Sequence, residues 1–227
     1  MPFSDLAARV AEVRDRIGGA VARGGRGQRV TVVAVTKSHG PDAVRAAWDV
    51  GLRDVGENRV QEAVGKMAAV DVPVTWHLIG HLQRNKIKAV DRFALVQSLD
   101  SERLADALHH HGVRRGRAVD VLLEVNVSGE ASKGGYTTGA LAAEAERLTA
   151  LPGVRVLGVM TMAPLDADER TLRRVFGGAR AARDLLEGAG HPAYELSMGM
   201  SGDYVVAVEE GATMVRLGTV LFGARAT

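Results

Sequence analysis

The chain has 227 residues, 46% of them hydrophobic, and its 29 basic and 27 acidic side chains nearly balance. This length suffices for one large core, and the balanced charge argues against nucleic acid or an anionic membrane as partner. The absence of cysteine excludes disulfides, thiolate catalysis and cysteine-bound metal. We therefore expect a single domain over residues 1–227 that acts as a monomer.

The amino-terminal segment mixes charged and apolar residues at helical spacing, without the apolar core of a signal peptide. We expect Ser4 to cap a first helix that ends at Gly18-Gly19 or shortly after. No stretch of the sequence reaches the length that is needed to cross a bilayer. A cytoplasmic protein is the resulting expectation. The apolar face of the first helix comprises Leu6, Val10, Val13 and Ile17.

Residues 30–37, VTVVAVTK, give the strongest strand signal of the chain. A run of β-branched and small apolar residues without polar alternation is typical of a strand buried on both faces, as in a parallel sheet. The run ends on Lys37, and the carboxyl ends of such strands are where barrels and open α/β sheets place their ligands. Desolvation there would favour the neutral amine, a nucleophile that can form a Schiff base. The alternative is a lysine whose stem lies along the rim and whose amine stays in water.

Strand and helix signals alternate along the rest of the chain, at intervals that suit crossover connections between parallel strands. Eight such units favour closure into a (β/α)8 TIM barrel, preceded here by an extra helix; an open, doubly wound sheet is the alternative. The further strands are expected at 53–58, 75–80, 93–100, 119–127, 154–163, 194–200 and 214–219. The intervening helices include one from Pro41 to about Val50, segments 59–69, 81–90 and 202–211, one capped by Asp100 or Ser101 that stops at Gly112, one through Leu148 and one ending near Gly188.

Polar residues at the strand ends of a barrel converge on one face, whatever their separation in sequence. Arg216 stands out, because it interrupts an apolar strand and shares the parity of Met214, so it would point inward and need an anion or acceptor. His77 could instead be an ordinary core histidine, and Asn58 could cap the following helix. The full set of candidates is Lys37, Asn58, His77, Ser197, Ser201, Arg216, Gly218 and Thr219.

Two segments rich in glycine and hydroxyl groups follow the last two strands, SMGMSGD (197–203) and RLGT (216–219). The loops at these places, with a short helix amino terminus, commonly bind phosphate in this fold. A Schiff-base lysine that faces a phosphate site suggests pyridoxal 5′-phosphate (PLP) as cofactor. Metal binding has little support, since the histidines at 109–111 end a helix, where they suit the helix dipole and the solvent.

Seven segments carry a resemblance to known proteins: AVTK, GENRVQE, WHLIGHLQRNK, NVSGEASKGG, GVMTMAP, ELSMGMSGDY and MVRLGTVLFGAR. Through them the chain resembles the pyridoxal-phosphate homeostasis proteins (the YggS/PROSC family). The resemblance implies the amino-terminal barrel of alanine racemase without that enzyme's second domain. It also implies a Schiff base at Lys37 and Arg216 near the pyridine nitrogen. The implied phosphate contacts are Ser201, Gly218 and Thr219, while Asn58, His77 and Ser197 fall on matching motif positions.

One position departs from the family pattern. Many members carry a second lysine two residues after the Schiff-base lysine, where this chain has His39. Lys133 matches a lysine that has been proposed in the family as a secondary cofactor contact. We expect a carrier that binds PLP at Lys37 and passes it to apo-enzymes that depend on PLP.

The alternative function is a small amino-acid racemase or lyase that uses the same Schiff base. Racemisation by two bases needs a second acid–base group opposite the lysine. Without cysteine, the candidates are Tyr136, Tyr194 and Tyr204. Of these, Tyr136 lies in the loop after the fifth expected strand, on the face that would hold the cofactor.

Overall fold

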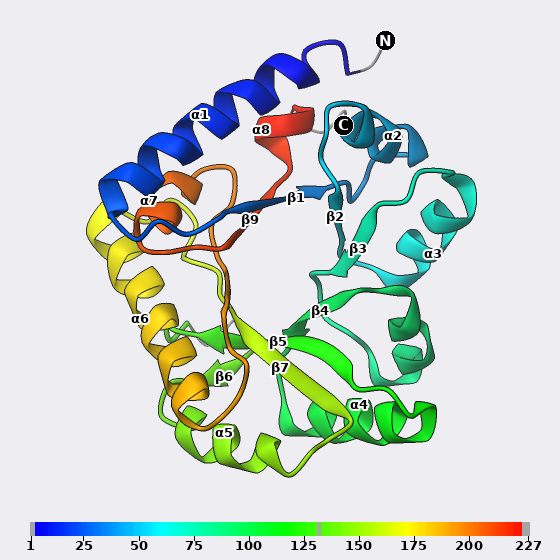
Figure 1. Cartoon of the computed structure of the whole chain (residues 1–227), viewed down its shortest axis with the longest axis vertical. Helices are drawn as coiled ribbons and strands as arrows, with labels where there is room; N and C mark the ends of the chain where they lie inside the picture. Colours follow the sequence, from blue (N-terminus) through cyan, green and yellow to red (C-terminus); the bar gives the residue numbers. More distant parts are fainter. Residues whose placement is uncertain (1–2, 131–132, 224–227) are drawn as a thin grey trace.

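Parallel strands close into a barrel in the computed structural model, which describes residues 3–130 and 133–223 (Figure 1). The strands pair in the order β4-β3-β2-β1-β9-β8-β7-β5, and a further pairing of β4 with β5 completes the ring. The closure confirms the (β/α)8 barrel and excludes the open sheet. The barrel strands of the described residues are β1 (Thr31–Val35), β2 (Asp54–Glu57), β3 (Thr75–Leu78), β4 (Leu95–Leu99), β5 (Val119–Asn126), β7 (Val154–Met160), β8 (Glu195–Ser197) and β9 (Met214–Leu217). A two-residue strand, β6 (Tyr136–Thr137), pairs in parallel with the end of β5, within a segment that the sequence indicated as a polar loop.

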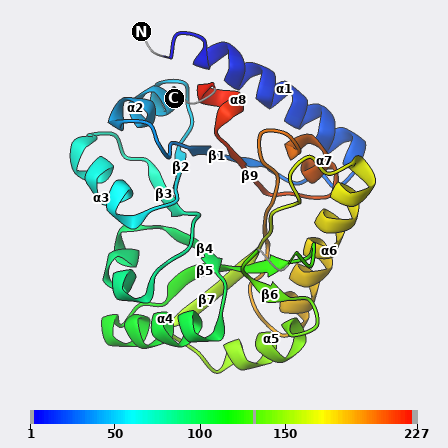
Figure 2. The same ribbon diagram turned by 180° about the vertical axis from the view of Figure 1, so that it is seen from behind.

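Helices surround the strands, as the view from behind also shows (Figure 2). The extra amino-terminal helix, α1, packs against α7 and α8. None of the described helices is long and apolar enough to span a membrane. The bounds are α1 (Leu6–Gly24), α2 (Pro41–Asp49), α3 (Val60–Ala69), the 3-10 helix η1 (Arg84–Arg92), α4 (Glu102–Arg115), α5 (Leu141–Thr149), α6 (Glu169–Gly188), α7 (Tyr204–Glu209) and α8 (Thr219–Phe222).

Helix α1 is longer than the sequence predicted and has a different cap. It continues through Gly18-Gly19 and ends at Gly24, where Gly25 adopts a left-handed conformation with φ 63°. Glycine inside a helix costs only about 1 kcal/mol relative to alanine, and the buried apolar face that continues to Ala20 offsets this cost. The cap residue is Asp5 rather than Ser4, whose hydroxyl donates a hydrogen bond to the Asp5 carboxylate.

Helix α4 and the segment before β4 also differ from expectation. Helix α4 does not stop at Gly112 but reaches Arg115. Gly112 allows close packing instead of ending the helix, since a Cβ there would lie 2.1 Å from the carbonyl oxygen of Gly153, just before β7. The helix expected over 81–90 is the 3-10 helix η1. Its two buried residues, Ile87 and Val90, are three positions apart, which matches the three residues per turn of a 3-10 helix.

The barrel interior combines a small apolar cluster with polar residues. Because side chains alternate along a strand, Arg216 shares the inner face of β9 with Met214, a member of that cluster. The register places Arg216 beside Val33 of β1, which also points inward. The cluster comprises Val33, Leu95, Leu122, Leu157, Met160 and Met214.

Candidate functional site

Backbone N–H groups from two loops converge at the carboxyl end of the barrel. In the described part of the chain, those of Ser201, Gly202, Gly218 and Thr219 donate to no backbone or side-chain acceptor. The Ser201 hydroxyl accepts a hydrogen bond from the N–H of Val220 (3.2 Å), which joins the two loops. We call residues 201–202 and 218–219 the anion cradle, because unpaired N–H groups with a hydroxyl beside them suit a phosphate or carboxylate.

Arg216 lies in the barrel interior with only 5% of its surface exposed. Its Nη1 donates to the carbonyl oxygen (2.8 Å) and hydroxyl (2.7 Å) of Ser197, and its Nη2 donates to the carbonyl of Thr161 (2.9 Å). Burial lowers the pKa of Arg216 to about 10, although Asp203 and Glu124 act at longer range in the opposite sense. The Nε–H and the second N–H of Nη2 have no acceptor among the described residues and are therefore available to a ligand.

His77 and Ser197 are both buried in the barrel and belong to one hydrogen-bonded chain. The ring of His77 lies between the Asp54 carboxylate (Nε2 to Oδ1, 2.9 Å) and the Gln97 amide (Nδ1 to Nε2, 3.1 Å). The Ser197 hydroxyl donates to Gln97 Oε1 at 2.6 Å. The structure thus connects two residues predicted for the site through Gln97, which the sequence did not single out.

Lys37 directly follows Thr36 at the end of β1, and both of its neighbours are held by one buried ionic cluster. Lys66 of α3 donates to the carbonyl of Thr36 (2.7 Å) and to the Glu57 and Glu62 carboxylates (2.7 and 2.9 Å). The Thr36 hydroxyl also donates to Glu57. On the other side of Lys37, the N–H of Ser38 donates to Glu62 (2.8 Å).

This ionic cluster fixes a strained backbone. Ser38 has φ 67°, a conformation that residues other than glycine rarely adopt and that costs of order 1 kcal/mol or more. Glu57 points out of the barrel toward α3, and its Oε2 is buried without a hydrogen-bond partner in the described residues. Burial raises the pKa of Glu57, while its hydrogen bonds with Lys66 and Thr36 act in the opposite direction.

The remaining predicted or discussed residues lie around the same end of the barrel. Asn58 follows β2, and its backbone packs so closely on Gly80 that a Cβ on Gly80 would lie 2.5 Å from the Asn58 carbonyl oxygen. His39 packs against the rings of Phe3 and Phe222, at centroid distances of 6.0 and 5.4 Å. Lys133 donates to the Glu130 carboxylate at 2.8 Å.

Two carboxyl groups near Arg216 were missed from the sequence. Burial and the neighbouring Asp100 raise the pKa of Glu124, and burial raises that of Asp203, whose Oδ1 accepts from the N–H of Met200. Glu124 could have been found, because it interrupts the apolar strand β5 and shares the inward parity of Leu122.

The tyrosine considered as a second base is engaged elsewhere. The Tyr136 hydroxyl donates to Glu144 of α5 at 2.8 Å, and burial together with this carboxylate raises its pKa. The histidines of α4 contact neighbouring segments: His109 Nδ1 accepts from the N–H of Gly153, and His111 pairs with Asp91.

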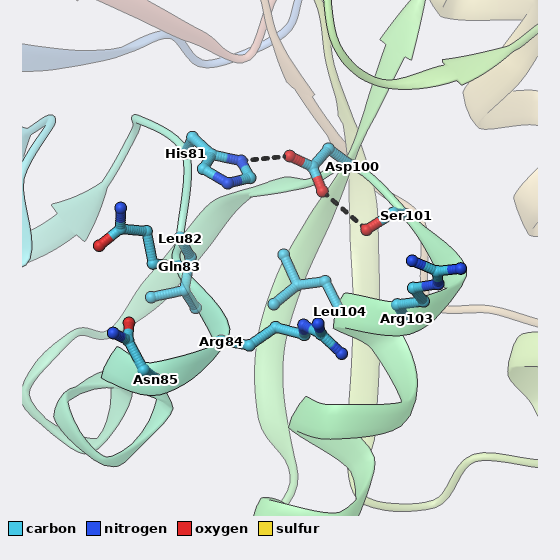
Figure 3. Close-up of a pocket in the computed structure, with 9 residues that line it drawn as sticks. All are labelled: His81, Leu82, Gln83, Arg84, Asn85, Asp100, Ser101, Arg103 and Leu104. Atoms are coloured by element: carbon cyan, nitrogen blue, oxygen red, sulfur yellow. Dashed lines mark hydrogen bonds and ion pairs between the residues drawn. The ribbon is translucent and has the colours of Figure 1, made fainter.

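A cavity of about 490 Å³ lies among the segments that follow β3 and β4 (Figure 3). Nδ1 of His81 and Oδ2 of Asp100 are hydrogen-bonded at one side of it (2.6 Å). Neither Arg84 nor Arg103, which also line it, makes an ion pair with another described residue. None of the predicted site residues lines this cavity.

The fold is a closed parallel barrel with a lysine after its first strand and the anion cradle after its last two strands. These features define a barrel of the alanine racemase type. The family described as "Alanine racemase, N-terminal domain" matches residues 9–226. Alanine racemase from Corynebacterium glutamicum shares this fold with a TM-score of 0.74 at 17% identity, and the similarity covers 99% of this chain and 62% of the enzyme.

Within this class, the chain belongs to the family of pyridoxal phosphate homeostasis proteins. It is 42% identical over 221 residues to the protein of that name from Aquifex aeolicus, covering 96% of this chain and 97% of the relative. The structure of PipY from Synechococcus elongatus with PLP bound is 38% identical, with a TM-score of 0.85 and coverage of 96% of this chain and 100% of PipY.

Proposed function

We propose that this protein binds PLP at the carboxyl end of its barrel, holds it as a Schiff base on Lys37, and acts as a carrier in intracellular PLP homeostasis. The observation that carries the proposal is the anion cradle, whose unpaired N–H groups lie at the same end of the barrel as Lys37. Bound PLP supplies an aldehyde carbon with which an amine condenses as water leaves. The amine in question is Nζ of Lys37.

The residues of this chain fit the three chemical groups of PLP. The cradle offers N–H groups and the Ser201 and Thr219 hydroxyls to the phosphate. The Nε–H of Arg216 suits a ring nitrogen that accepts a hydrogen bond. A nitrogen that accepts from a guanidinium stays unprotonated, which makes the ring a weak electron sink.

The direct test is an absorption spectrum of the purified protein with PLP, before and after borohydride reduction, followed by peptide mapping. We expect the reduced adduct on Lys37. Lys37→Ala should lose the yellow absorbance while keeping the fold, whereas Lys133→Ala should keep both. An adduct found on Lys133 in the wild type would show the assignment to be wrong. The carrier role predicts in addition that the loaded protein reactivates an apo-enzyme that requires PLP.

Glu124 gives a specific reason to test the racemase or lyase alternative. Burial raises the pKa of its carboxyl group, which also lies within electrostatic range of Arg216, and a raised pKa is the direction expected of a general acid–base group. The measurement is exchange of the α-proton of L-alanine in deuterated buffer, with chiral analysis of the product. Under the carrier proposal we expect negligible exchange. Rapid exchange that disappears in Glu124→Gln would establish the enzyme instead.

A further inference from the structure

A chain of hydrogen bonds crosses the barrel from Arg216 to Asp54. Each member comes from a different strand, in the order β9, β8, β4, β3 and β2. Every link measures between 2.6 and 3.1 Å. Asp54 also lines a cavity of about 240 Å³ between α1 and the start of β1, away from the anion cradle. The members in order are Arg216, Ser197, Gln97, His77 and Asp54.

The chemistry of Arg216 and Asp54 sets the direction of donation along this chain of hydrogen bonds. A guanidinium only donates, so the Ser197 oxygen accepts from Arg216 and its proton goes to the Gln97 carbonyl oxygen. The Gln97 amide nitrogen then donates to Nδ1 of His77, and its second hydrogen lies toward Met214 Sδ, at 3.8 Å.

The remaining link follows from the same rule. With Nδ1 accepting from Gln97, the ring of His77 carries its proton on Nε2 and donates it to the Asp54 carboxylate, which only accepts. Each donor therefore has one acceptor. With the Gln97 amide turned over, the single ring proton of His77 would lie on Nδ1, and the lone pair of Nε2 would face the Asp54 carboxylate. The chain has a single consistent arrangement, from Arg216 as first donor to Asp54 as last acceptor.

We propose that Asp54, His77, Gln97 and Ser197 are positioning residues that hold the Arg216 guanidinium in one orientation, with its Nε–H left for the ligand. This inference rests on the proposed function, in which that N–H faces the ring nitrogen of PLP. His77 and Ser197 would then act on the cofactor through Arg216.

The burial of Arg216 explains why such a chain matters. The guanidinium makes no hydrogen bond or ion pair with a described carboxylate, so its orientation depends on neutral acceptors. A serine hydroxyl can rotate and offer its proton or its lone pairs. By accepting the Ser197 proton, Gln97 turns the lone pairs toward Arg216, and His77 and Asp54 in turn fix the Gln97 amide.

The test compares Gln97→Leu and Ser197→Ala with a matched control, Ser98→Ala. Ser98 is a buried serine in β4 whose hydroxyl donates to the Gly80 carbonyl at 2.7 Å, outside the chain. The first readout is NMR of arginine Nε–H groups in the protein without cofactor. We expect slow proton exchange at Arg216 in the wild type and in Ser98→Ala, and exchange at least about tenfold faster in the two chain variants.

The second readout is affinity for PLP and for a deaza analogue that has C–H in place of the ring nitrogen. Gln97→Leu and Ser197→Ala should weaken PLP about tenfold and leave the deaza analogue within about twofold of wild type. Ser197→Thr keeps the hydroxyl and should restore PLP binding. If Gln97→Leu fails to fold, Gln97→Glu is the substitute, since it keeps the acceptor for Ser197 but loses the N–H that faces His77.

The outcomes separate this inference from the proposed function. Arg216 exchange that is unchanged in the chain variants, or equal losses for PLP and its deaza analogue, would overturn the positioning role. If the wild type fails to bind PLP, the proposed function is wrong, and the exchange measurement on the cofactor-free protein still decides whether the chain holds Arg216.

Discussion

Two buried cations of this protein, Lys66 and Arg216, are equally hidden from solvent and differ in their partners. Each is 5% exposed. The three N–H groups of Lys66 are all used, two on carboxylates and one on a backbone carbonyl. Arg216 donates only to neutral oxygens and keeps its Nε–H unpaired within the described residues.

This difference separates a structural cation from one that is available to a ligand. A buried cation whose donors are all satisfied within the protein has no donor left for a ligand. Its removal leaves the surrounding carboxylates buried without a partner. A buried guanidinium with a spare donor costs stability in the free protein and can regain part of that cost on binding an acceptor. We therefore assign Lys66 a role in folding and propose Arg216 as a residue of the ligand site.

The largest effect is expected from Lys66→Met. It leaves the Glu57 carboxylate buried without its cation, so the free energy of unfolding should fall by about 3–5 kcal/mol at neutral pH. Denaturant unfolding measures this loss. Lys88→Met, a change at an exposed lysine of η1, is the control and should leave stability nearly unchanged. Adding Glu57→Gln to Lys66→Met should recover part of the loss, and no recovery would contradict the ionic explanation.

Arg216→Met should show the opposite pattern. Replacing a buried cation that lacks a carboxylate partner with an apolar side chain removes a desolvation cost, so stability should change by less than about 1 kcal/mol. Affinity for PLP should fall about tenfold to a hundredfold, as expected for a lost hydrogen bond from a charged donor. Thermal melts and absorbance titration measure the two quantities. A stability loss as large as that of Lys66→Met would remove the distinction between the two cations.

The loss in Lys66→Met should also depend on pH. Burial raises the pKa of Glu57 above its unfolded value, and removing Lys66 raises it further. A carboxyl group with a raised folded pKa adds stability below its unfolded pKa, and this stability is lost as pH rises through the folded pKa. The variant should therefore recover stability relative to wild type as the pH falls from neutral into the acidic range. A difference between variant and wild type that stays constant over this range would contradict the assignment to Glu57.

The smallest effects concern the anion cradle, where we expect Gly218→Val to weaken PLP more than Thr219→Ser does. A bulkier side chain hinders close approach to the backbone, whereas serine keeps the hydroxyl. The affinity for pyridoxal, which lacks the phosphate, should change little in either variant, and we expect the difference for PLP to be about 1 kcal/mol. Equal PLP affinities in the two variants would place the phosphate elsewhere. A Cβ on Gly218 would lie 3.6 Å from Val35 Cβ, an ordinary contact, and Gly218→Ala is therefore the control for the effect of the Cβ alone.

The sequence by itself predicted the barrel and the loops in which we propose the site. Unbroken apolar strands such as 30–37 need cover on both faces, which only a parallel sheet with helices around it provides. An arginine in an apolar strand needs an acceptor inside the barrel, so Arg216 could be predicted from its parity alone. The glycine and hydroxyl residues of 197–203 and 216–219 identified the loops that form the anion cradle, because their position after the last strands is a property of the fold.

Only the tertiary structure decided which side chains support these groups. Asp54 and Gln97 look like ordinary polar residues in their segments, and they join Arg216 because barrel closure brings β2, β4 and β9 around one interior. A lysine in a helix is usually exposed, yet Lys66 is buried against Glu57 because α3 packs on β2. The length of α1 was settled in the same way, by the burial of its apolar face beyond Gly19. Side-chain partners depend on the distances between segments, and packing fixes those distances while local sequence patterns do not encode them.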